Sequence, residues 1–447
     1  MSGLFLCPVS AMSADLLTHL SVRLVTVIPA GGAVCVGLSG GMDSVVLLHL
    51  LSQLAPRHGW RVSALHVHHG ISPNAAAWAD FCAGLCERLG VPLAVERVDI
   101  APLRHLGIEA AARTLRHAAL ARQFAEFIAL AHHADDQAET LLLQLLRGAG
   151  LKGAAAMSEL KAGDSGPALL RPLLGCTRRE LLDYATAHDL SWIEDESNAD
   201  TGYPRNFLRH HILPRLERHY PACRETLARS AAHFAEADAL LTELAQQDAG
   251  GAWGETLAVE RLAVLSRPRA ANLLRQFLHA RGAPLPQAAQ LDQMLTQLAS
   301  PRANAEVCVE FGGWQVRRYQ GAAYVLPRPA PFDPALVLDW QESASLHWPP
   351  LARDIHFRPL SGQGISLDKL RTARVTLRLR QGGESLRPHP RAATRTLKNL
   401  LQQHQIPPWQ RARLPLLYCG EQLVSVIGVA VAAEWQASAG EAGLGVG

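Results

Sequence analysis

The stretch Ala33–Ser44 reads AVCVGL then SGGMDS, and an apolar pattern of helical period begins at Val45. A buried strand, a small-residue loop and a helix N-terminus in this order are suited to hold an anion. The glycines permit unusual backbone angles, the serine hydroxyls add hydrogen-bond donors, and the first helical turn presents unpaired N–H groups. We therefore expect residues 39–44 to bind a phosphate or a pyrophosphate.

Asp43 distinguishes this loop from a Walker nucleotide loop. A Walker loop carries a lysine that contacts the β- and γ-phosphates, whereas this loop has no lysine and places a carboxylate at Asp43. A carboxylate beside a polyphosphate is repulsive unless a divalent cation lies between them, which predicts Mg²⁺ on Asp43. The loop resembles the PP-loop of the ATP pyrophosphatase superfamily. That resemblance implies that ATP binds at Ser39, Gly40, Gly41, Met42, Asp43 and Ser44.

The composition limits the class of protein. The chain has 447 residues, of which 48% are hydrophobic and 19% charged, as in a globular protein of two or three domains. Its eight cysteines form no Cys-x-x-Cys pair, which argues against a zinc ribbon, an iron–sulfur site and a disulfide framework. We find neither a signal peptide nor an apolar run long enough to span a membrane. We therefore expect a cytoplasmic protein with no membrane partner.

The first two hundred residues alternate between strand-like and helix-like segments. This alternation predicts an α/β domain with a doubly wound parallel sheet and helices on both faces. The polar runs 39–44, 66–70 and 132–136 each follow a predicted strand, at the edge where such sheets bind ligands. The predicted strands cover 33–38, 61–67, 92–98 and 128–131, and the predicted helices cover 74–89, 108–127, 135–146 and 177–188.

The rest of the chain predicts a mainly helical middle region and a small α+β C-terminal domain. Helical patterns cover 215–299, short strands 307–326, and the proline-rich run 327–331 is a stiff linker. In the C-terminal part we predict a strand at 375–380, a helix at 395–404, strands around Leu414 and Leu423, and a disordered tail at 440–447. The resulting domains are 1–214, 215–330 and 345–436.

The C-terminal part is basic. Between Arg353 and Gly420, 13 Lys and Arg residues stand against 3 acidic residues. Such a segment can bind nucleic-acid phosphates, or it can be an ordinary solvated face, and charge alone does not decide between the two.

Two histidine-rich runs suggest chemistry next to the loop. His66–Gly70 reads HVHHG and His132–Asp136 reads HHADD. Both contain zinc-ligand types, so a binuclear zinc hydrolase is a rival class, although its usual His-x-His-x-Asp-His run is not completed here. The alternative is that these histidines bind substrate or simply form hydrogen bonds at strand ends.

Acidic and basic pairs accompany these runs. Asp136 and Glu139 lie on one face of a predicted helix, where they could hold Mg²⁺, accept a substrate ammonium group or serve only the helix dipole. Arg113 and Arg116 are one turn apart and could clamp a phosphate or carboxylate or form an exposed stripe. The motif that contains Asn198 and the following Arg205-Asn206 can by themselves be capping residues.

Taken together, these segments resemble the tRNA(Ile)-lysidine synthetase family, whose N-terminal domain has the PP-loop fold. The resemblance is strong over the first two hundred residues and continues at Leu379–Pro388, Arg395–Lys398 and Ile406–Arg411. Two positions depart from the family pattern: Gly383-Glu384 stands where the family usually has Gly-Asp, and His117 stands where it often has Tyr. The segments that carry the N-terminal resemblance are 39–44, 66–70, 113–116, 132–140, 195–198 and 205–206.

The resemblance implies that the enzyme adenylates the carbonyl oxygen at carbon 2 of the wobble cytidine, in an isoleucine tRNA with a CAU anticodon. The side-chain amine of free lysine then displaces AMP. It implies ATP and Mg²⁺ as cofactors and leaves open whether a homodimer forms. The implied catalytic residues are Asp43, Asp136, Glu139, His132 and His133. The implied substrate- and tRNA-binding residues are Arg113, Arg116, Asn198, Arg205, Arg380, Arg387, Arg395 and Lys398.

Two alternatives stay open beside this function. Another PP-loop tRNA modifier, such as a cytidine thiolase, would use the same loop, and its iron–sulfur-dependent forms need Cys-x-x-Cys pairs that are absent. A non-catalytic RNA-binding protein could keep the same fold, but the intact loop Ser39–Ser44 argues against decay.

Overall fold

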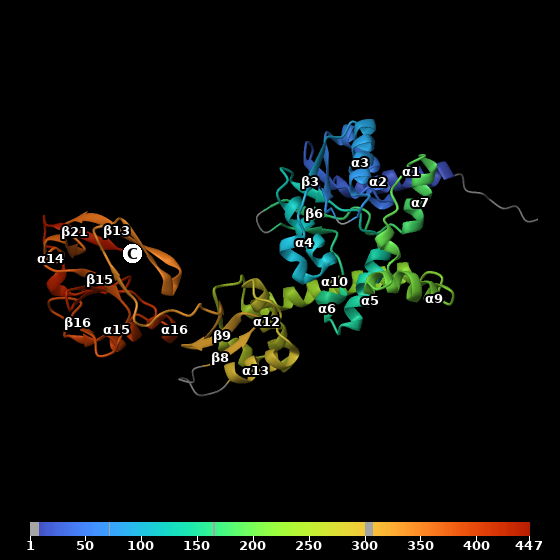
Figure 1. The fold of residues 1–447 in the computed structure, drawn as a ribbon. Helices are drawn as coiled ribbons and strands as arrows, with labels where there is room; N and C mark the ends of the chain where they lie inside the picture. Colours follow the sequence, from blue (N-terminus) through green and yellow to red (C-terminus); the bar gives the residue numbers. More distant parts are fainter. Residues whose placement is uncertain (1–8, 71, 164–165, 300–306) are drawn as a thin grey trace, which may run out of the picture. The chain divides into compact units, whose positions relative to one another are not determined.

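The structure is a computed structural model that describes residues 9–70, 72–163, 166–299 and 307–447. It divides into two compact units, one ending at Glu243 and one beginning at Leu244 (Figure 1). Each unit has its own buried core. In the described residues, every helix is too short or too polar to cross a membrane.

The N-terminal unit is built on a six-stranded sheet with the order β3-β2-β1-β4-β6-β5. Five strands run parallel and confirm the predicted α/β sheet, while β5 pairs antiparallel with β6 at one edge. The β5–β6 pair was not predicted, because strands of two and three residues carry too little alternation to recognise. The strands are β1 (Ala33–Gly37), β2 (Arg61–His68), β3 (Leu93–Arg97), β4 (Phe127–Ala129), β5 (Leu160–Lys161) and β6 (Ala168–Leu170).

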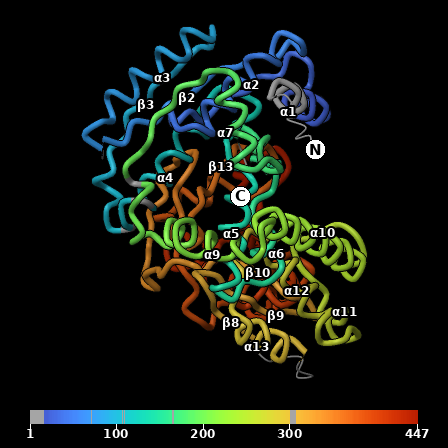
Figure 2. The backbone as a smooth tube through the Cα atoms, turned by 90° about the vertical axis from the view of Figure 1, so that its right-hand side faces the viewer, coloured from blue at the N-terminus to red at the C-terminus, as the bar shows by residue number. Residues whose placement is uncertain are grey.

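Helices cover both faces of this sheet, as the doubly wound prediction requires. Val34 and Val36 of β1 join the core formed with one set of helices, whereas Cys35 between them packs with Ala119 and Leu120 of α4 on the other face. Figure 1 shows α2 and α3 at the top of this unit and α4 below them, and Figure 2 shows the same helices along the backbone tube. The first set is α1 (Val9–Leu24), α2 (Met42–His58), α3 (Ala75–Leu89) and α7 (Arg178–Ala187), and α4 is Ile108–Ala121.

The connecting helices change from one face of the sheet to the other between β1 and β4, which are neighbours in the sheet. Because the chain leaves these two strands in opposite directions, a crevice opens beyond their carboxyl ends. The loop 38–41 follows β1, and residues 130–133 follow β4 and lead into α5 (Ala134–Leu146). The topology therefore brings two of the predicted polar runs together.

One predicted helix is shorter than its pattern suggested. The expected helix 108–127 ends at Ala121, because Phe127 already pairs with Val34 of β1 and Ala168 of β6 as the first residue of β4. An apolar run at a helix end and an apolar strand start look alike in sequence, so the boundary was misplaced.

A widened helical turn follows the sheet. Residues Leu208–Ile212 (η3) form a π-helix between α8 (Pro204–Phe207) and α9 (Leu213–Glu217). Pro214 lacks an N–H group and its ring clashes with the preceding turn, which accounts for the widening. The N-terminal unit is completed by η1 (Ala101–Leu106), α6 (Leu151–Ala154), η2 (Glu196–Ala199) and the first part of α10 (Cys223–Ala249).

The second unit starts with the predicted helical region and short strands. Its antiparallel sheet has the order β7-β10-β9-β8 and packs with three helices around Phe277 and Met294. The elements are β7 (Thr256–Ala258), α11 (Val259–Val264), α12 (Arg267–Ala280), α13 (Ala288–Leu298), β8 (Cys308–Phe311), β9 (Trp314–Tyr319) and β10 (Ala322–Pro327).

The C-terminal part is an antiparallel β structure with short helices, in agreement with the predicted α+β class. The predicted strand at 375–380 is β15, the predicted helix at 395–404 is α15, and strands around Leu414 and Leu423 are β18 and β19. Its main sheets have the orders β11-β15-β18-β19-β20 and β12-β13-β21-β14, and β16 pairs with β17.

The bounds of the strands in this part are β11 (Val337–Asp339), β12 (Ser345–Trp348), β13 (Arg353–Ser361), β14 (Ile365–Ser366), β15 (Val375–Arg378), β16 (Ser385–Leu386), β17 (Arg395–Thr396), β18 (Leu416–Cys419), β19 (Gln422–Val426), β20 (Ala430–Val431) and β21 (Ala442–Val446). The short helices are η4 (Pro349–Leu351), α14 (Leu367–Leu370), α15 (Leu397–Gln403), α16 (Pro408–Arg411) and η5 (Ala433–Trp435).

The prediction of a disordered tail at 440–447 is wrong. Residues Ala442–Val446 form β21, which pairs with β13 and β14 at the centre of a four-stranded sheet. The glycine-rich composition hid the strand, but glycine is required here: a Cβ on Gly443 would lie 1.9 Å from the Gln363 carbonyl oxygen. Leu444 is the apolar residue that anchors β21 in the core.

We expect Leu444→Ala to destabilise the β13–β21 pairing by about 2–4 kcal/mol, because it leaves a cavity where a side chain only 4% exposed was packed. Hydrogen exchange of the β13 amides in the full chain measures this opening free energy. The control is Ala442→Ser on the exposed face of the same strand, for which we expect a change within about 0.5 kcal/mol. Equal exchange in both variants would contradict an ordered β21.

Candidate active site

The loop after β1 is held by its own serine hydroxyls. Ser44 donates its hydroxyl to the Gly41 carbonyl (2.9 Å) and accepts the backbone N–H of Ser39 (3.2 Å), and Gly41 donates its N–H to the Ser39 hydroxyl (3.3 Å). Ser44 is buried and Ser39 is exposed. The side chain of Met42 lies in the core, so only its backbone N–H is available to a phosphate. Hydrogen bonds within the loop itself therefore stabilise its conformation.

Gly40 is required by the geometry of the loop. Its φ is +89°, and a Cβ would lie 2.6 Å from Cδ1 of Ile193. The Ile193 backbone N–H donates to the Gly40 carbonyl (2.9 Å), which fixes the segment after α7 against the loop. From the next strand, a ring nitrogen of His66 lies 2.9 Å from the Leu38 carbonyl oxygen, so His66 supports the loop.

Asp43 faces the second histidine run. Its Oδ1 is buried and has no hydrogen-bond partner in the structure, and its Oδ2 lies 3.6 Å from Nε2 of His133. His133 also lies 3.5 Å from Oδ2 of Asp136 and 3.7 Å from Oδ1 of Asp135. Burial alone would lower the pKa of His133, but the three carboxylates outweigh it and the pKa is raised. The carboxylates thus favour the protonated form of His133.

Glu139 is completely buried and fully paired. Its carboxylate accepts Nε of Arg209 at 2.6 Å and Nη2 of Arg209 at 2.9 Å, and it lies 3.0 Å from Nε of Arg205. Arg205 also donates to the Thr140 hydroxyl (2.8 Å), and Arg209 reaches Asp136 at 3.3 Å. Because both oxygens are occupied by guanidinium groups, the geometry favours a role for Glu139 in positioning the two arginines.

Asp136 keeps its negative charge. Burial opposes ionisation, but His133 and Arg205, with His132 and Arg209, outweigh it and lower the pKa of Asp136. Its Oδ2 also accepts the backbone N–H of His133 (3.1 Å). A carboxylate can accept about four hydrogen bonds, so Asp136 retains capacity for a substrate amine.

Asp135 is fixed from the other side of this network. Its Oδ2 lies 2.9 Å from Nη1 of Arg224, at the start of α10, and its Oδ1 accepts the backbone N–H of Arg178 (3.0 Å). Arg224 also pairs with Glu217. Asp135 therefore connects α5 with α7 and α10, and it helps to position the ring of His133.

His132 is neutral. Burial is the main cause that lowers its pKa to about 4, and the charges of Arg171, Arg205 and Arg113 add to it, while Asp136 opposes them. Its Nδ1 is buried without a hydrogen-bond partner in the described structure. His132 can therefore accept a hydrogen bond or a proton from a substrate group.

The remaining predicted N-terminal residues lie at the rim. Arg113 and Arg116 are exposed on α4, and Arg116 lies 3.5 Å from Nε2 of His69. Asn198 is exposed in η2, and its backbone carbonyl faces Nε2 of His210 at 2.8 Å. The structure thus brings the residues at 39–44, 132–139 and 205 together and leaves Asn198 at the periphery.

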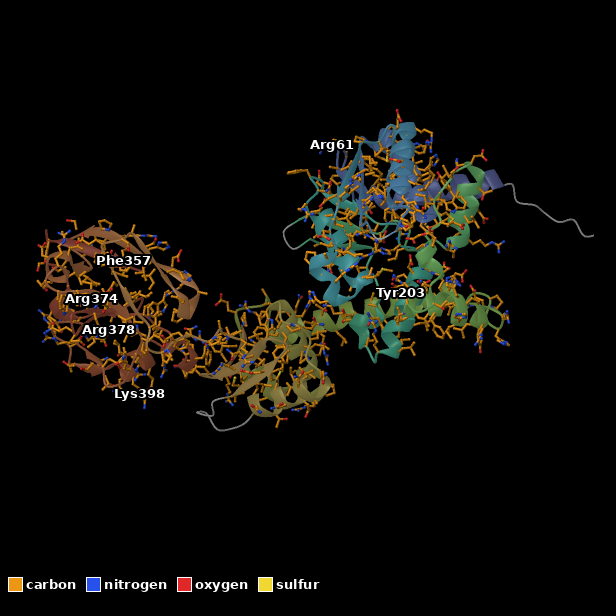
Figure 3. All side chains as sticks on the ribbon, viewed as in Figure 1. Arg61, Tyr203, Phe357, Arg374, Arg378 and Lys398 are labelled. Carbon is orange, nitrogen blue, oxygen red and sulfur yellow. The ribbon has the colours of Figure 1, made fainter. Side chains whose placement is uncertain are left out.

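The predicted C-terminal residues differ in how their charges are compensated. Arg380 lies 3.5 Å from Glu384 and Arg387 lies 3.8 Å from Glu434. Arg395 contacts the neutral Gln403, and Lys398 is exposed on α15, where its side chain projects from the surface (Figure 3). Arg395 and Lys398 are consequently the more available pair for an anionic partner.

Glu384, one of the two departures from the family pattern, has a structural role. It accepts the backbone N–H groups of Gln381 and Gly382, where Gly382 and Gly383 have φ of +104° and +85°. Burial opposes ionisation, but the backbone hydrogen bonds and Arg380 lower the pKa of Glu384. Its longer side chain fulfils the turn-holding role that a carboxylate can take at this position. His117, the other departure, lies exposed on α4.

The site can be tested for its fit to a metal. In the residues that the structure describes, no group of three or more His, Cys, Asp or Glu side chains is arranged around a common metal position. Asp43, however, offers an unpartnered carboxylate oxygen in the first turn of α2. Mg²⁺ binds phosphate oxygens and water with one or two carboxylates, and Asp43 fits that requirement.

Sequence reasoning missed Arg171, Arg209 and Arg224. Arg209 lies four residues after Arg205, and Arg171 directly follows the apolar run 168–170. The strand-end rule that selected 132–136 would have selected Arg171 had β6 been recognised. Arg224 has no comparable signal, because its partner Asp135 is distant in sequence.

Comparison with known proteins gives matches along most of the chain. Residues 17–216 match the PP-loop domain, residues 257–324 the TilS substrate binding domain, and residues 375–446 the TilS substrate C-terminal domain. A tRNA(Ile)-lysidine synthase from Nitrosomonas europaea is 41% identical over 93% of this chain and 91% of its own length. The one from Aromatoleum aromaticum is 42% identical over 92% and 96%, and the one from Coxiella burnetii is 37% identical over 95% and 95%.

We expect Gly40→Ala to lower the free energy of unfolding of the N-terminal unit by about 1–3 kcal/mol, because the new Cβ meets Ile193 at a positive φ. The matched control is Gly41→Ala, where φ is −71° and the nearest atom to the new Cβ is the Ser39 hydroxyl at 3.5 Å. For the control we expect a change within about 1 kcal/mol. Urea unfolding of the full chain without nucleotide provides the comparison, and equal losses would contradict the assigned loop geometry.

Proposed function

This chain belongs to the tRNA(Ile)-lysidine synthase family, and we propose that it joins free lysine to carbon 2 of the wobble cytidine in an isoleucine tRNA with a CAU anticodon. It is an ATP-using ligase of the PP-loop type that forms lysidine on tRNA. The observation that carries the proposed residue roles is the meeting of Asp43 with His133 and Asp136 at the switch point of the sheet. A cytidine thiolase or a non-catalytic RNA-binding protein is not favoured by the family membership.

The loop 39–44 is proposed to hold the pyrophosphate part of ATP. Backbone N–H groups and the N-terminus of α2 attract phosphate oxygens. Asp43 would bind the Mg²⁺ that neutralises the polyphosphate and stabilises the leaving pyrophosphate. The cytidine oxygen attacks the α-phosphorus, the bond to pyrophosphate breaks, and the poor leaving oxygen becomes a good one. Arg205, held by Glu139, can offset the negative charge that develops.

The second step needs a deprotonated amine. The side-chain ammonium of lysine has a pKa of about 10.4 in water and is protonated when it arrives. We assign Asp136, which stays ionised, to hold this ammonium group, and His132, which stays neutral, to accept its proton as the nitrogen bonds to carbon 2. AMP leaves with the former carbon-2 oxygen. His133 positions the carboxylates of Asp43 and Asp136.

The C-terminal domain is proposed to bind tRNA. Exposed cations on α15 and on the β16–β17 hairpin suit phosphate contacts, with Arg395 and Lys398 the least compensated of the predicted set. Arg113 and Arg116 on α4 are proposed to bind RNA near the reaction site. We also propose three domains, with the limits 1–214, 215–330 and 345–436. We further propose a cytoplasmic location, because tRNA is modified there.

The function is tested in a reaction that contains tRNA transcript, ATP and radiolabelled lysine. Pyrophosphate release and label in tRNA are measured in the full reaction and with each component omitted in turn. We expect label in tRNA only when all are present. Asp43→Asn should reduce pyrophosphate release by at least about 100-fold, because the metal-binding charge is lost, and it should leave tRNA binding unchanged. Full activity of this variant, or labelling of tRNA when ATP is omitted, would contradict the proposal.

We expect Arg395→Ala combined with Lys398→Ala to weaken tRNA binding and to reduce the slope of log affinity against log salt by about 1–2 units. Filter binding between low and moderate salt measures both quantities. The control pair is Arg371→Ala with Arg374→Ala, whose charges are already paired with Glu342 and Asp339. An unchanged slope in the first variant would show that this surface does not contact the RNA backbone.

A further inference from the structure

Arg171 is a buried cation without a compensating acid. It follows β6 and is only 9% exposed. Its Nη1 donates to the Ser158 carbonyl (2.6 Å), and its Nε is buried without a hydrogen-bond partner among the residues that the structure describes. Within the described residues no carboxylate lies within ion-pair distance of its guanidinium group, and the neighbouring Glu159 is paired with Arg23 at 2.6 Å.

The surroundings of Arg171 are positive as well. The charge of Arg113 adds to the burial that lowers the pKa of Arg171. On α4, partial burial of the His117 ring lowers the pKa of His117, and so do the charges of Arg113, Arg116, Arg171 and Lys161. The charges that act on Arg171 and on His117 are therefore all positive.

An uncompensated guanidinium is costly to bury. Removing a charge from water costs several kcal/mol in a real protein unless an opposite charge or good acceptors replace the water. Glu139 shows the compensated arrangement in the same site, since its single carboxylate is paired with two arginines. Arg171 has one neutral carbonyl acceptor instead. This asymmetry indicates that the counter-ion of Arg171 is supplied by a ligand.

We propose that Arg171, with Arg113 beside it, binds the α-carboxylate of the amino-acid substrate. The inference rests on the proposed function, which supplies lysine as that substrate. The backbone N–H of Leu130 donates to the Leu170 carbonyl oxygen (2.9 Å), so the segment that leads to His132 and Asp136 runs beside the strand end that leads to Arg171. One substrate molecule can therefore place its side-chain ammonium at Asp136 and its carboxylate at Arg171. The planar guanidinium group can donate two parallel hydrogen bonds to a carboxylate.

The position of Arg171 separates this carboxylate from the other anions of the reaction. The phosphate-binding loop follows β1, whereas β6 lies two strands away across β4, at about 10 Å for a strand spacing of about 4.8 Å. A phosphodiester of a long RNA remains at the protein surface, whereas Arg171 is buried. Of the substrates of the proposed reaction, the small amino acid therefore suits this buried position best.

Selectivity between lysine and cadaverine, which lacks the carboxylate, tests the inference. We expect the wild-type chain to prefer lysine in tRNA labelling, and Arg171→Met to lower kcat/KM for lysine by about 10–100-fold, mainly through KM. The kcat/KM for cadaverine and the KM for ATP should change by less than about twofold, because neither involves the carboxylate contact. Arg57→Met, which removes an exposed cation in the last turn of α2, at the end of that helix away from the phosphate-binding loop, is the matched control and should leave the lysine KM unchanged.

Arg171→Lys covers the case in which the methionine variant does not fold. It keeps the charge but loses the planar fork, so an intermediate loss of lysine selectivity is expected. Equal losses for lysine and cadaverine, or a raised KM for ATP in either variant, would overturn the inference while leaving the proposed function intact. If the wild-type chain transfers no lysine to tRNA, the proposed function fails and this inference fails with it.

Discussion

The buried carboxylate of Glu139 is the constraint on which the active site depends. A side chain with no exposed surface cannot carry a charge unless cations replace its water, and Arg205 and Arg209 do so. Both arginines lie on the segment 204–212, so the ion pairs draw that segment over α5. The π-helical turn before Pro214 is part of the same segment. The ion pairs of Glu139 thus fix the position of the segment 204–212, which is distant from Glu139 in sequence.

The same network reaches the phosphate-binding loop. Arg209 contacts both Glu139 and Asp136, Asp136 contacts His133, and His133 faces Asp43 at the start of α2. Asp43 follows β1, and His133 and Asp136 follow β4, the neighbouring strand on the other side of the change of helix face. Arg209 comes from η3. The sheet therefore provides proximity, and the alternating charges provide orientation. A change at any member alters the field at the others, so the site acts as a unit.

Sequence reasoning found the parts of the site that depend on local pattern. The loop Ser39–Ser44 and the run from His132 were located because strand ends and small residues are visible in one stretch of chain. The roles of Glu139, Asp135 and Arg171 depend on partners far away in sequence, and no local pattern shows whether a carboxylate is paired. The tail strand Ala442–Val446 was missed for a related reason, since its glycines admit close backbone neighbours that composition does not reveal.

A count of basic residues likewise overstated the charge available in the C-terminal part. Arg374 and Arg378, labelled in Figure 3, are paired with Asp339 and Glu421, and others are paired in the same way. A paired arginine presents little net charge to a polyanion, so formal charge and binding surface are different quantities. The useful question for each cation is which acid faces it. In this chain, Lys398 is exposed to solvent and available to a polyanion. Arg171 is buried, and we assign its opposite charge to a ligand carboxylate.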